Sequence, residues 1–426
     1  MPSTRGRLRP LHLLPILIVT TSESNPMLDQ QTPGQWAVRW FAIVFVAALC
    51  ASVPLVHIVW YGVYGNDEPV IATRSQKSAP TATLTNVMSG EWMPEKAREL
   101  QELSPVVWSL RGHWNELRYR MGIPQSDRVT FGKDDWLFST HSMRRRYRDL
   151  EATKQERLAA LVRVRDAVRK SGSELVVAVV PDKERVYPDR AYPDGVLPAA
   201  KAKVYDALMA ELDALDIVRV DLATPLIAAR ATITSGKDED ELYYARDTHW
   251  RPSGALVANT AISAVIESEF GSALRPRQAI RLTGPSTVRA VGDLSSLLGF
   301  LSAVRPGNNT NQQTMAMSLL TDSLTEVRQY YGVEMATQNA AIGLFGDDPN
   351  AEVMLVGTSF ANANGMNALM FTLGRPVHAN IELGAASTEP MLTTLEQLRN
   401  GRKTKVVIWE IVERGFFSES WKTPSL

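Results

Sequence analysis

The sequence predicts an α/β fold whose central sheet is mainly parallel. The first observation is a set of short, continuously apolar runs, which are typical of strands covered on both faces: ELVVAVVP (Glu174–Pro181), EVMLV (Glu352–Val356) and KVVIWEIV (Lys405–Val412). The second is that segments with apolar residues three and four positions apart, as in helices, lie between these runs. Strands that alternate with helices favour parallel β-α-β units, so we expect an α/β/α sandwich.

The individual elements follow from local patterns. In FGKDDWLFST, residues 131–140, Gly132 predicts a turn and Trp-Leu-Phe predicts the strand after it. IVRVDL, residues 217–222, predicts a further strand. Ser253 is the expected N-cap of a helix. Residues 271–346 are less regular and predict an insertion or a sheet edge. The predicted helices cover residues 154–170, 200–214 and 253–270, and a segment from Gly-Thr-Ser to about residue 373.

Composition and charge exclude several classes of protein. The 426 residues carry 46 Lys and Arg against 46 Asp and Glu, so no strongly basic field invites nucleic acid. The sequence contains no glycine-rich nucleotide loop, Walker motif or Cys/His zinc spacing, and we therefore expect no cofactor. The single cysteine, Cys50, excludes an intramolecular disulfide.

An uncharged apolar run near the N-terminus predicts a transmembrane helix over residues 40–64. No Asp, Glu, Lys or Arg occurs from Trp40 to Asn66, and a spanning helix needs roughly 20 such residues. Trp and Tyr residues lie near both ends of the run, as in the aromatic belts of membrane proteins. The alternatives are a buried core helix and a cleaved signal peptide, although a signal core is shorter than this run.

The flanking charges predict the orientation of this helix and the division of the chain. Arg39 precedes the run and Asp67 follows it, so the positive-inside rule places residues 1–39 in the cytoplasm. Residues 65–110 begin with a Thr-, Ser-, Ala- and Pro-rich stretch and predict a linker with a helix beside the main domain. Residues 111–426 are then the catalytic domain, outside the cytoplasm.

The stretch YYARDTHWRPSGA, residues 243–255, contains the first candidate for chemistry. Of the six histidines, His249 is the one with a carboxylate two residues away, that of Asp247. A histidine paired with a carboxylate is the acid–base device of serine hydrolases and acyltransferases. Half of a metal site and an ordinary polar loop are the alternatives. The metal interpretation lacks a third ligand in the sequence.

The stretch VMLVGTSFANANGM, residues 353–366, predicts a nucleophile at a strand-to-helix turn. Gly357 permits a tight turn, and Ser359 is expected at the helix N-terminus. The backbone N–H groups of Ser359 and Phe360 are candidates for an oxyanion hole, with Asn362 and Asn364 as side-chain candidates. An ordinary turn with a capping serine is the alternative. Together with Asp247 and His249, however, the serine favours a hydrolase or acyltransferase.

In this order along the chain, the motifs GKDDWLF, VVPDKERVYP, DTHWRPSGA, VGDL, GTSFA and VVIWEIVER resemble the AlgX/AlgJ family of polysaccharide O-acetylation proteins. The resemblance covers residues 131–414. It implies an SGNH-hydrolase-like α/β domain in which the Asp-x-His pair precedes the serine. By this match Asp247 is the acid, His249 the base and Ser359 the nucleophile, and Trp250 is an aromatic that packs.

The resemblance also brings two residues after a strand to the site. Asp182 and Lys183 match the family's Pro-Asp-Lys at a strand end. Lys183 is a candidate for oxyanion or substrate binding, and a surface salt bridge is the alternative. Four aromatic residues are candidates for stacking on sugar rings or, alternatively, for the core: Trp136, Tyr187, Tyr243 and Tyr244.

The function that the resemblance implies is transfer of an acetyl group to hydroxyls of a polysaccharide acceptor. Little chain follows Arg414, so the expected architecture is closer to the membrane-anchored AlgJ than to AlgX with its added carbohydrate-binding module. The expected partner is a membrane-bound O-acyltransferase that supplies acetyl, and the expected location is the bacterial inner membrane with the catalytic domain in the periplasm. A carbohydrate acetyl-esterase and a non-catalytic scaffold of an envelope polysaccharide complex are the alternatives.

Overall fold

The computed structural model describes residues 114–115, 117–118, 121, 128–143, 150–298, 325–335, 350–383 and 388–417. All of them belong to one compact unit, residues 69–426. The predicted cytoplasmic tail, membrane helix and linker, residues 1–110, lie outside the described residues. Within the described ranges, no helix is both long and apolar enough to span a bilayer.

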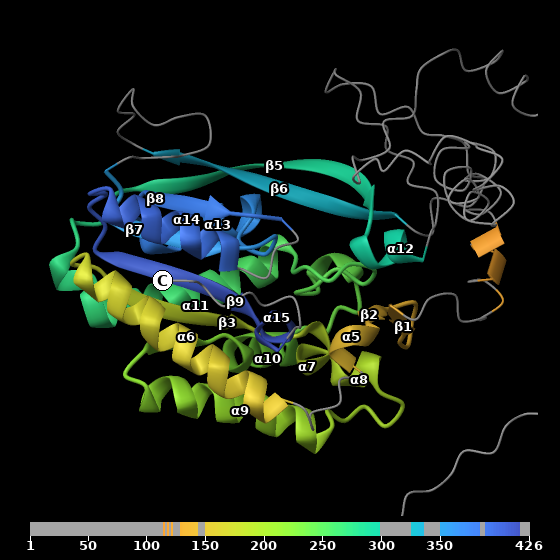
Figure 1. Ribbon diagram of the computed structural model, residues 1–426. Coiled ribbons are helices and arrows are strands. Elements are labelled where there is room, and N and C mark those ends of the chain that lie inside the picture. Colours follow the sequence, from red (N-terminus) through yellow and green to blue (C-terminus); the bar gives the residue numbers. More distant parts are fainter. Residues whose placement is uncertain are drawn as a thin grey trace, which may run out of the picture. The chain divides into compact units, whose positions relative to one another are not determined.

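The central sheet has five strands, all parallel, in the order β4-β3-β9-β7-β8 (Figure 1). Every residue of β9 and of its neighbour β7 is buried, and on the other side of β9 Val177 of β3 lies opposite Trp409. The structure confirms the predicted parallel sheet and adds β8, which the sequence patterns did not reveal. The strands are β3 (Glu174–Val180), β4 (Val218–Asp221), β7 (Val353–Gly357), β8 (Val377–Ile381) and β9 (Val406–Val412).

Helices cover both faces of the sheet, because alternate side chains of each strand point to opposite sides. In β3, Val176, Ala178 and Val180 enter one apolar cluster, and the intervening residues enter a second one. The first cluster is covered by α10 (Ala223–Ala231), α11 (Pro252–Phe270) and α13 (Ala363–Leu373). The second is covered by α6 (Leu150–Lys170), α9 (Ala199–Ala214) and α14 (Thr388–Arg399).

Two antiparallel pairs lie outside this sheet. The predicted Trp-Leu-Phe strand is β2 (Leu137–Ser139), which pairs with β1 (Val129–Phe131). The turn between them holds Asp134 and Asp135 at positive φ, a conformation that favours glycine. The predicted insertion contains a two-stranded ribbon, β5 (Ile280–Val291) with β6 (Thr325–Met335). We call β5 and β6 the ribbon.

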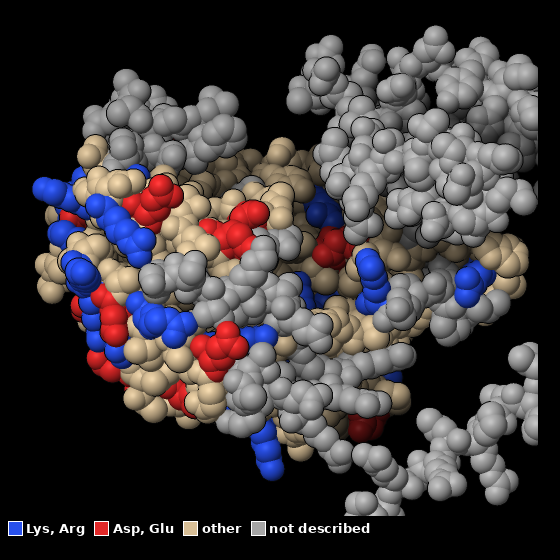
Figure 2. All heavy atoms as spheres, viewed as in Figure 1, with Lys and Arg blue, Asp and Glu red and all other residues tan. Residues whose placement is uncertain are grey.

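Short helices complete the described structure. They are α5 (Thr140–Met143), α7 (Lys183–Val186), α8 (Pro188–Ala191), α12 (Asp293–Leu297) and α15 (Glu413–Phe416), with 3-10 turns at Asp238–Asp240 and Gly271–Ala273. On the face shown in Figure 2, acidic and basic side chains are interspersed, as the zero net charge suggests.

Two local predictions were wrong. The N-cap of α11 is Arg251, because Pro252 takes the first helical position, and the Ser253 hydroxyl instead donates to the Glu241 carbonyl at 2.9 Å. Ser359 does not begin a helix, since α13 starts at Ala363 and the serine lies in the preceding turn.

Candidate active site

The candidate residues meet at the carboxyl ends of three neighbouring strands. Parallel strands end at one edge of a sheet, where ligand sites of α/β folds form. Asp182 and Lys183 follow β3, and Ser359 follows β7. Glu413 follows β9 directly. The loop that carries Asp247 and His249 is closed by a bridge between Tyr243 and Trp250, and it leads directly into α11.

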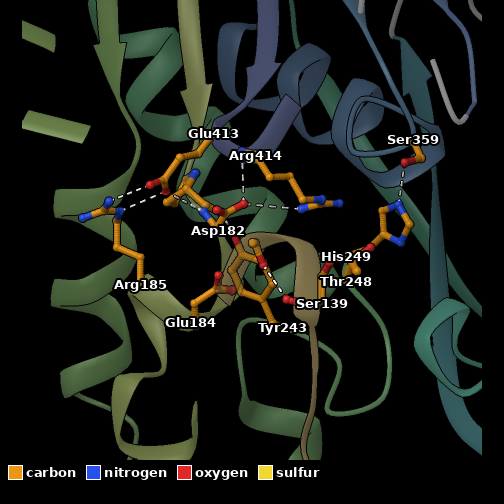
Figure 3. A network of polar contacts seen from close by, with 12 residues as sticks. Ser139, Asp182, Glu184, Arg185, Tyr243, Thr248, His249, Ser359, Glu413 and Arg414 are labelled. Atoms are coloured by element: carbon orange, nitrogen blue, oxygen red, sulfur yellow. Dashed lines mark hydrogen bonds and ion pairs between the residues drawn. The ribbon is translucent and has the colours of Figure 1, made fainter. Parts of the chain in front are cut away.

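The structure brings Asp247, His249 and Ser359 into one hydrogen-bonded chain. His249 Nε2 lies 2.6 Å from Ser359 Oγ (Figure 3), although 110 residues separate them. His249 Nδ1 lies 2.5 Å from Asp247 Oδ1, which also accepts the backbone N–H of His249 at 2.9 Å. The two-residue spacing therefore lets one carboxylate oxygen fix both the backbone and the ring of His249.

The second oxygen of Asp247 is also occupied. Oδ2 accepts the backbone N–H of Asp293 at 2.9 Å and contacts Nη2 of Arg328, which comes from β6. Burial would raise the pKa of the Asp247 carboxyl, but its bond to His249, the charge of His249 and the Arg328 guanidinium lower that pKa far below its ordinary value. Asp247 thus remains a carboxylate at every pH at which a histidine base operates.

Asp293, in the VGDL motif, holds the middle of the Asp-Thr-His segment. Its Oδ1 accepts the Thr248 N–H at 2.7 Å, and its Oδ2 accepts the Thr248 hydroxyl at 2.5 Å. Oδ2 also lies 3.7 Å from His249 Nδ1. Burial and the charge of Asp247 raise the pKa of Asp293. Asp293 therefore holds the residue between Asp247 and His249 in place.

Asp293 also reopens the question of a metal. The absence of a third ligand was a wrong premise, because donor atoms of Asp247, His249 and Asp293 lie within 4.8 Å of one another. The surroundings nevertheless disfavour a cation. The Arg328 guanidinium already lies against Asp247, and the Asp247 oxygen facing His249 bonds to its Nδ1. The arrangement suits proton transfer along the chain better than metal ligation.

Three of the predicted oxyanion residues, Gly357, Phe360 and Asn362, lie within three positions of Ser359 in the sequence. Phe360 packs its ring against His249, with centroids 4.8 Å apart, and edge-on against Trp250, and its backbone N–H remains an oxyanion candidate. Asn362 is exposed and remains a candidate. Gly357 serves close packing, because an added Cβ would lie 2.6 Å from the Cβ of Ala361.

Asn364 has a different position from the predicted one. Its Nδ2 donates to the Gln329 carbonyl at 2.8 Å, and its Oδ1 accepts the Tyr331 N–H at 3.2 Å. Both ends of the amide therefore bind the backbone of β6. The structure assigns Asn364 to holding the ribbon beside the serine, not to an oxyanion hole.

Lys183 is buried, so the surface salt bridge considered from the sequence is wrong. Its ammonium donates to the carbonyls of Leu137 and Ala245 at 2.8 Å and of Asp247 at 3.1 Å. An ammonium has three N–H donors, and these bonds use all of them, which leaves none for an oxyanion. Burial lowers the pKa of Lys183 to about 8. Its role is to position the loop that carries Asp247.

A buried ionic network joins the ends of β3 and β9 (Figure 3). Asp182 bonds to Lys201 at 2.9 Å and accepts the Arg414 N–H at 3.2 Å. Arg185 bonds to Glu413 at 2.6 Å. The Arg414 side chain, 3.7 Å from Asp182, lies over the Phe360 ring. No role could be predicted for Asp182 from the sequence. The structure shows that it links the ends of β3 and β9 beneath the site.

Glu410, on β9, is a further buried group beneath the serine. Its Oε1 would lie 3.2 Å from a Cβ added at Gly357, in the turn that leads to Ser359. Burial raises the pKa of Glu410 to about 8, against the lowering effect of the backbone N–H groups of Thr358 and Ala361. A glutamate inside the apolar run KVVIWEIV was a usable signal in the sequence.

The four aromatic residues weighed as sugar platforms belong to the core. Each is buried, and Trp136, Tyr187 and Tyr243 pack against one another. Tyr244 lies under the guanidinium of Arg251. The core alternative is therefore confirmed.

An α/β/α sandwich with a parallel sheet, and a serine, a histidine and an aspartate bonded in series at its carboxyl edge, are features of α/β serine hydrolases and acyltransferases. The chain belongs to the family described as "ALGX: SGNH hydrolase-like domain, acetyltransferase AlgX", which matches residues 129–413.

Individual relatives agree with this family. The probable alginate O-acetylase AlgJ of Pseudomonas syringae pv. tomato is 28% identical over 345 residues, which are 80% of this chain and 82% of that protein. The alginate biosynthesis protein AlgX of Pseudomonas aeruginosa is 25% identical over 284 residues, 65% of this chain and 54% of that protein. The solved O-acetyltransferase domain of Pseudomonas putida AlgJ is 26% identical, with a TM-score of 0.54, and covers 69% of this chain and 94% of that one. The architecture is therefore AlgJ-like.

Proposed function

We propose that this protein is a membrane-anchored O-acetyltransferase that moves an acetyl group onto hydroxyls of a polysaccharide through Ser359, His249 and Asp247. The observation that carries the proposal is the unbroken hydrogen-bond chain from Ser359 Oγ through the His249 ring to Asp247. The family, with relatives named as probable alginate O-acetylases, supports acetyl transfer as the reaction.

In the first half-reaction the serine takes the acetyl group. His249 Nε2 accepts the proton of Ser359 Oγ as this oxygen attacks the acetyl carbonyl carbon. The resulting oxyanion lies against the backbone N–H groups of the turn, Phe360 among them. When the intermediate collapses, the bond to the donor breaks, and His249 returns the proton to the leaving group. Asp247 holds the Nδ1–H throughout.

In the second half-reaction a sugar hydroxyl attacks the acetyl-Ser359 ester. His249 takes the hydroxyl proton and then delivers it to Ser359 Oγ as the new ester forms and the old one breaks. Water in place of the sugar would give hydrolysis through the same groups. The residues that surround Ser359, His249 and Asp247, and not these three residues themselves, therefore decide between transfer and hydrolysis.

We also propose where the protein works. Residues 40–64 would anchor it in the bacterial inner membrane with the catalytic domain in the periplasm, and a membrane-bound O-acyltransferase would supply acetyl. The support is the uncharged run with its flanking charges, together with the AlgJ-like architecture. Accessibility of an added surface cysteine in the catalytic domain to a membrane-impermeant reagent tests the orientation.

The decisive experiment uses the purified full chain with 4-nitrophenyl acetate as donor and a mannuronate oligosaccharide as acceptor. We expect mass spectrometry to find acetyl on Ser359 and on the oligosaccharide. Both products should vanish in Ser359→Ala and persist in Ser272→Ala, an exposed serine. Undiminished acetylation in Ser359→Ala would sink the assignment. Acetate release without sugar acetylation would identify an esterase. The absence of acetyl from both Ser359 and the oligosaccharide, without acetate release, would identify a scaffold.

A further inference from the structure

Strand β6 of the ribbon places an exposed aromatic side chain beside the proposed catalytic chain. Arg328 and Tyr330 are two residues apart, so both side chains leave the same side of the strand. The Arg328 guanidinium contacts Asp247. Tyr330 therefore lies two residues along the strand from its contact with Asp247.

A second contact holds Tyr330 from the serine's side. Asn364 lies five residues after Ser359, in the first turn of α13. Its amide binds the Gln329 carbonyl and the Tyr331 N–H, which are the backbone groups on either side of Tyr330. The backbone of Tyr330 is therefore fixed next to the turn that carries the proposed nucleophile.

Tyr330 is nevertheless 37% exposed. The aromatic residues of the catalytic loop and of β2 are buried, so they offer no face to a ligand. An exposed aromatic side chain on a backbone held by Asn364 suits an apolar, disc-shaped partner at small entropic cost. The C–H face of a pyranose ring has this shape and chemistry.

We propose that Tyr330 is the stacking platform for the acceptor sugar, holding a pyranose ring of the polysaccharide beside Ser359. This inference rests on the proposed function and names the side chain that would favour a sugar hydroxyl over water. Asn364 keeps the backbone of Tyr330 in place, and the ring face makes the contact with the sugar.

The first test measures binding without turnover. In a Ser359→Ala background, isothermal titration calorimetry compares Tyr330→Ala, Tyr330→Phe and Phe371→Ala, with a mannuronate hexasaccharide and cellohexaose as probes. Phe371, on α13, is 38% exposed and serves as the matched control. We expect Tyr330→Ala to weaken binding of at least one probe about tenfold, and the other two changes to leave it within about twofold.

Three outcomes would overturn the platform. They are no binding of either probe by the parent, equal binding by Tyr330→Ala, and a Tyr330→Phe loss as large as that of Tyr330→Ala, which would show that the hydroxyl, not the ring face, makes the contact. With Ser359 restored, we expect Tyr330→Ala to raise the acceptor KM about tenfold with a smaller change in kcat. An equal fall in acetyl-enzyme formation would also contradict the platform. Failure of the proposed function appears separately, as acetylation that survives Ser359→Ala.

Discussion

Glu410 lies beneath the turn that carries Ser359, and its replacement by glutamine removes a titratable group while keeping the shape of the side chain. A glutamine carbonyl can still face the N–H groups of Thr358 and Ala361 that lower the pKa of Glu410. The substitution Glu410→Gln therefore isolates the effect of charge from the effect of packing.

The magnitude follows from the pKa of the buried carboxyl. Burial raises the pKa of Glu410 from 4.5 to about 8, so the folded state binds a proton that the unfolded chain releases between these values. Stability must then fall as pH rises from 4.5 to 8. Each pKa unit corresponds to about 1.4 kcal/mol, and the total loss is about 5 kcal/mol. The Glu410→Gln variant has no carboxyl at this position, so its unfolding free energy should not show this fall.

Urea unfolding of both proteins at pH 5, 6, 7 and 8 measures the difference. We expect the unfolding free energy of the native chain, relative to Glu410→Gln, to decrease by about 1.4 kcal/mol per pH unit until it levels off near pH 8. Glu396→Gln, at an exposed glutamate, is the control and should run parallel to the native chain. Parallel curves for Glu410→Gln as well would refute the raised pKa.

Three further predictions concern residues that hold the site. Arg328→Met should lower kcat/KM about tenfold, because Asp247 loses the guanidinium that holds its second carboxylate oxygen. Lys183→Met should lower the unfolding free energy at pH 7 by about 2–4 kcal/mol, since three buried carbonyls lose a donor. The folded pKa of Lys183, about 8, lies below the 10.5 of the unfolded chain, so the native chain should gain up to about 3 kcal/mol on this variant as pH rises from 8 to 10.5. Asn364→Ala should speed amide hydrogen exchange of the ribbon at Tyr331, measured by mass spectrometry. The control for Arg328→Met is Arg281→Met on the exposed part of β5, and the control for Lys183→Met is Lys170→Met at an exposed lysine. The control for Asn364→Ala is amide exchange in β3, which should not change. An unchanged kcat/KM in Arg328→Met, a pH-independent stability difference for Lys183→Met, or unchanged exchange at Tyr331 would contradict the respective prediction.

The central strands and helices could be predicted because their apolar patterns are local. Runs such as residues 174–180 and 406–412 are buried on both faces and therefore contain little polar sequence. Strand β8 was missed because it lies at the sheet edge and carries His378 and Asn380 among its five residues. An edge strand needs only part of the apolar pattern, so sequence periodicity alone does not reveal it.

The candidate site likewise contains residues that the sequence predicted and residues that it did not reveal. Asp247 and His249 lie two residues apart, and Ser359 was predicted because it follows an apolar strand at a turn and matches the family's nucleophile. Arg328 lies 81 residues from Asp247 and meets it only through the ribbon. No local pattern encodes that contact. Asp293 lay in a recognised motif, but its bonds to Thr248 depend on how α12 packs.

The wrong assignments of Lys183 and Asn364 share one physical cause. Catalytic residues lie on irregular backbone, whose N–H and C=O groups must find partners once they are buried. Here Glu326 accepts the N–H groups of Ala245 and Arg246, and Lys183 donates to the carbonyls of Ala245 and Asp247. The loop before His249 is thus bound on both its donor and its acceptor groups. Polar side chains near such a loop are as much needed to hold its backbone as to meet a substrate. A count of the donors that remain after the backbone is satisfied separates the two roles, and Lys183 has none left.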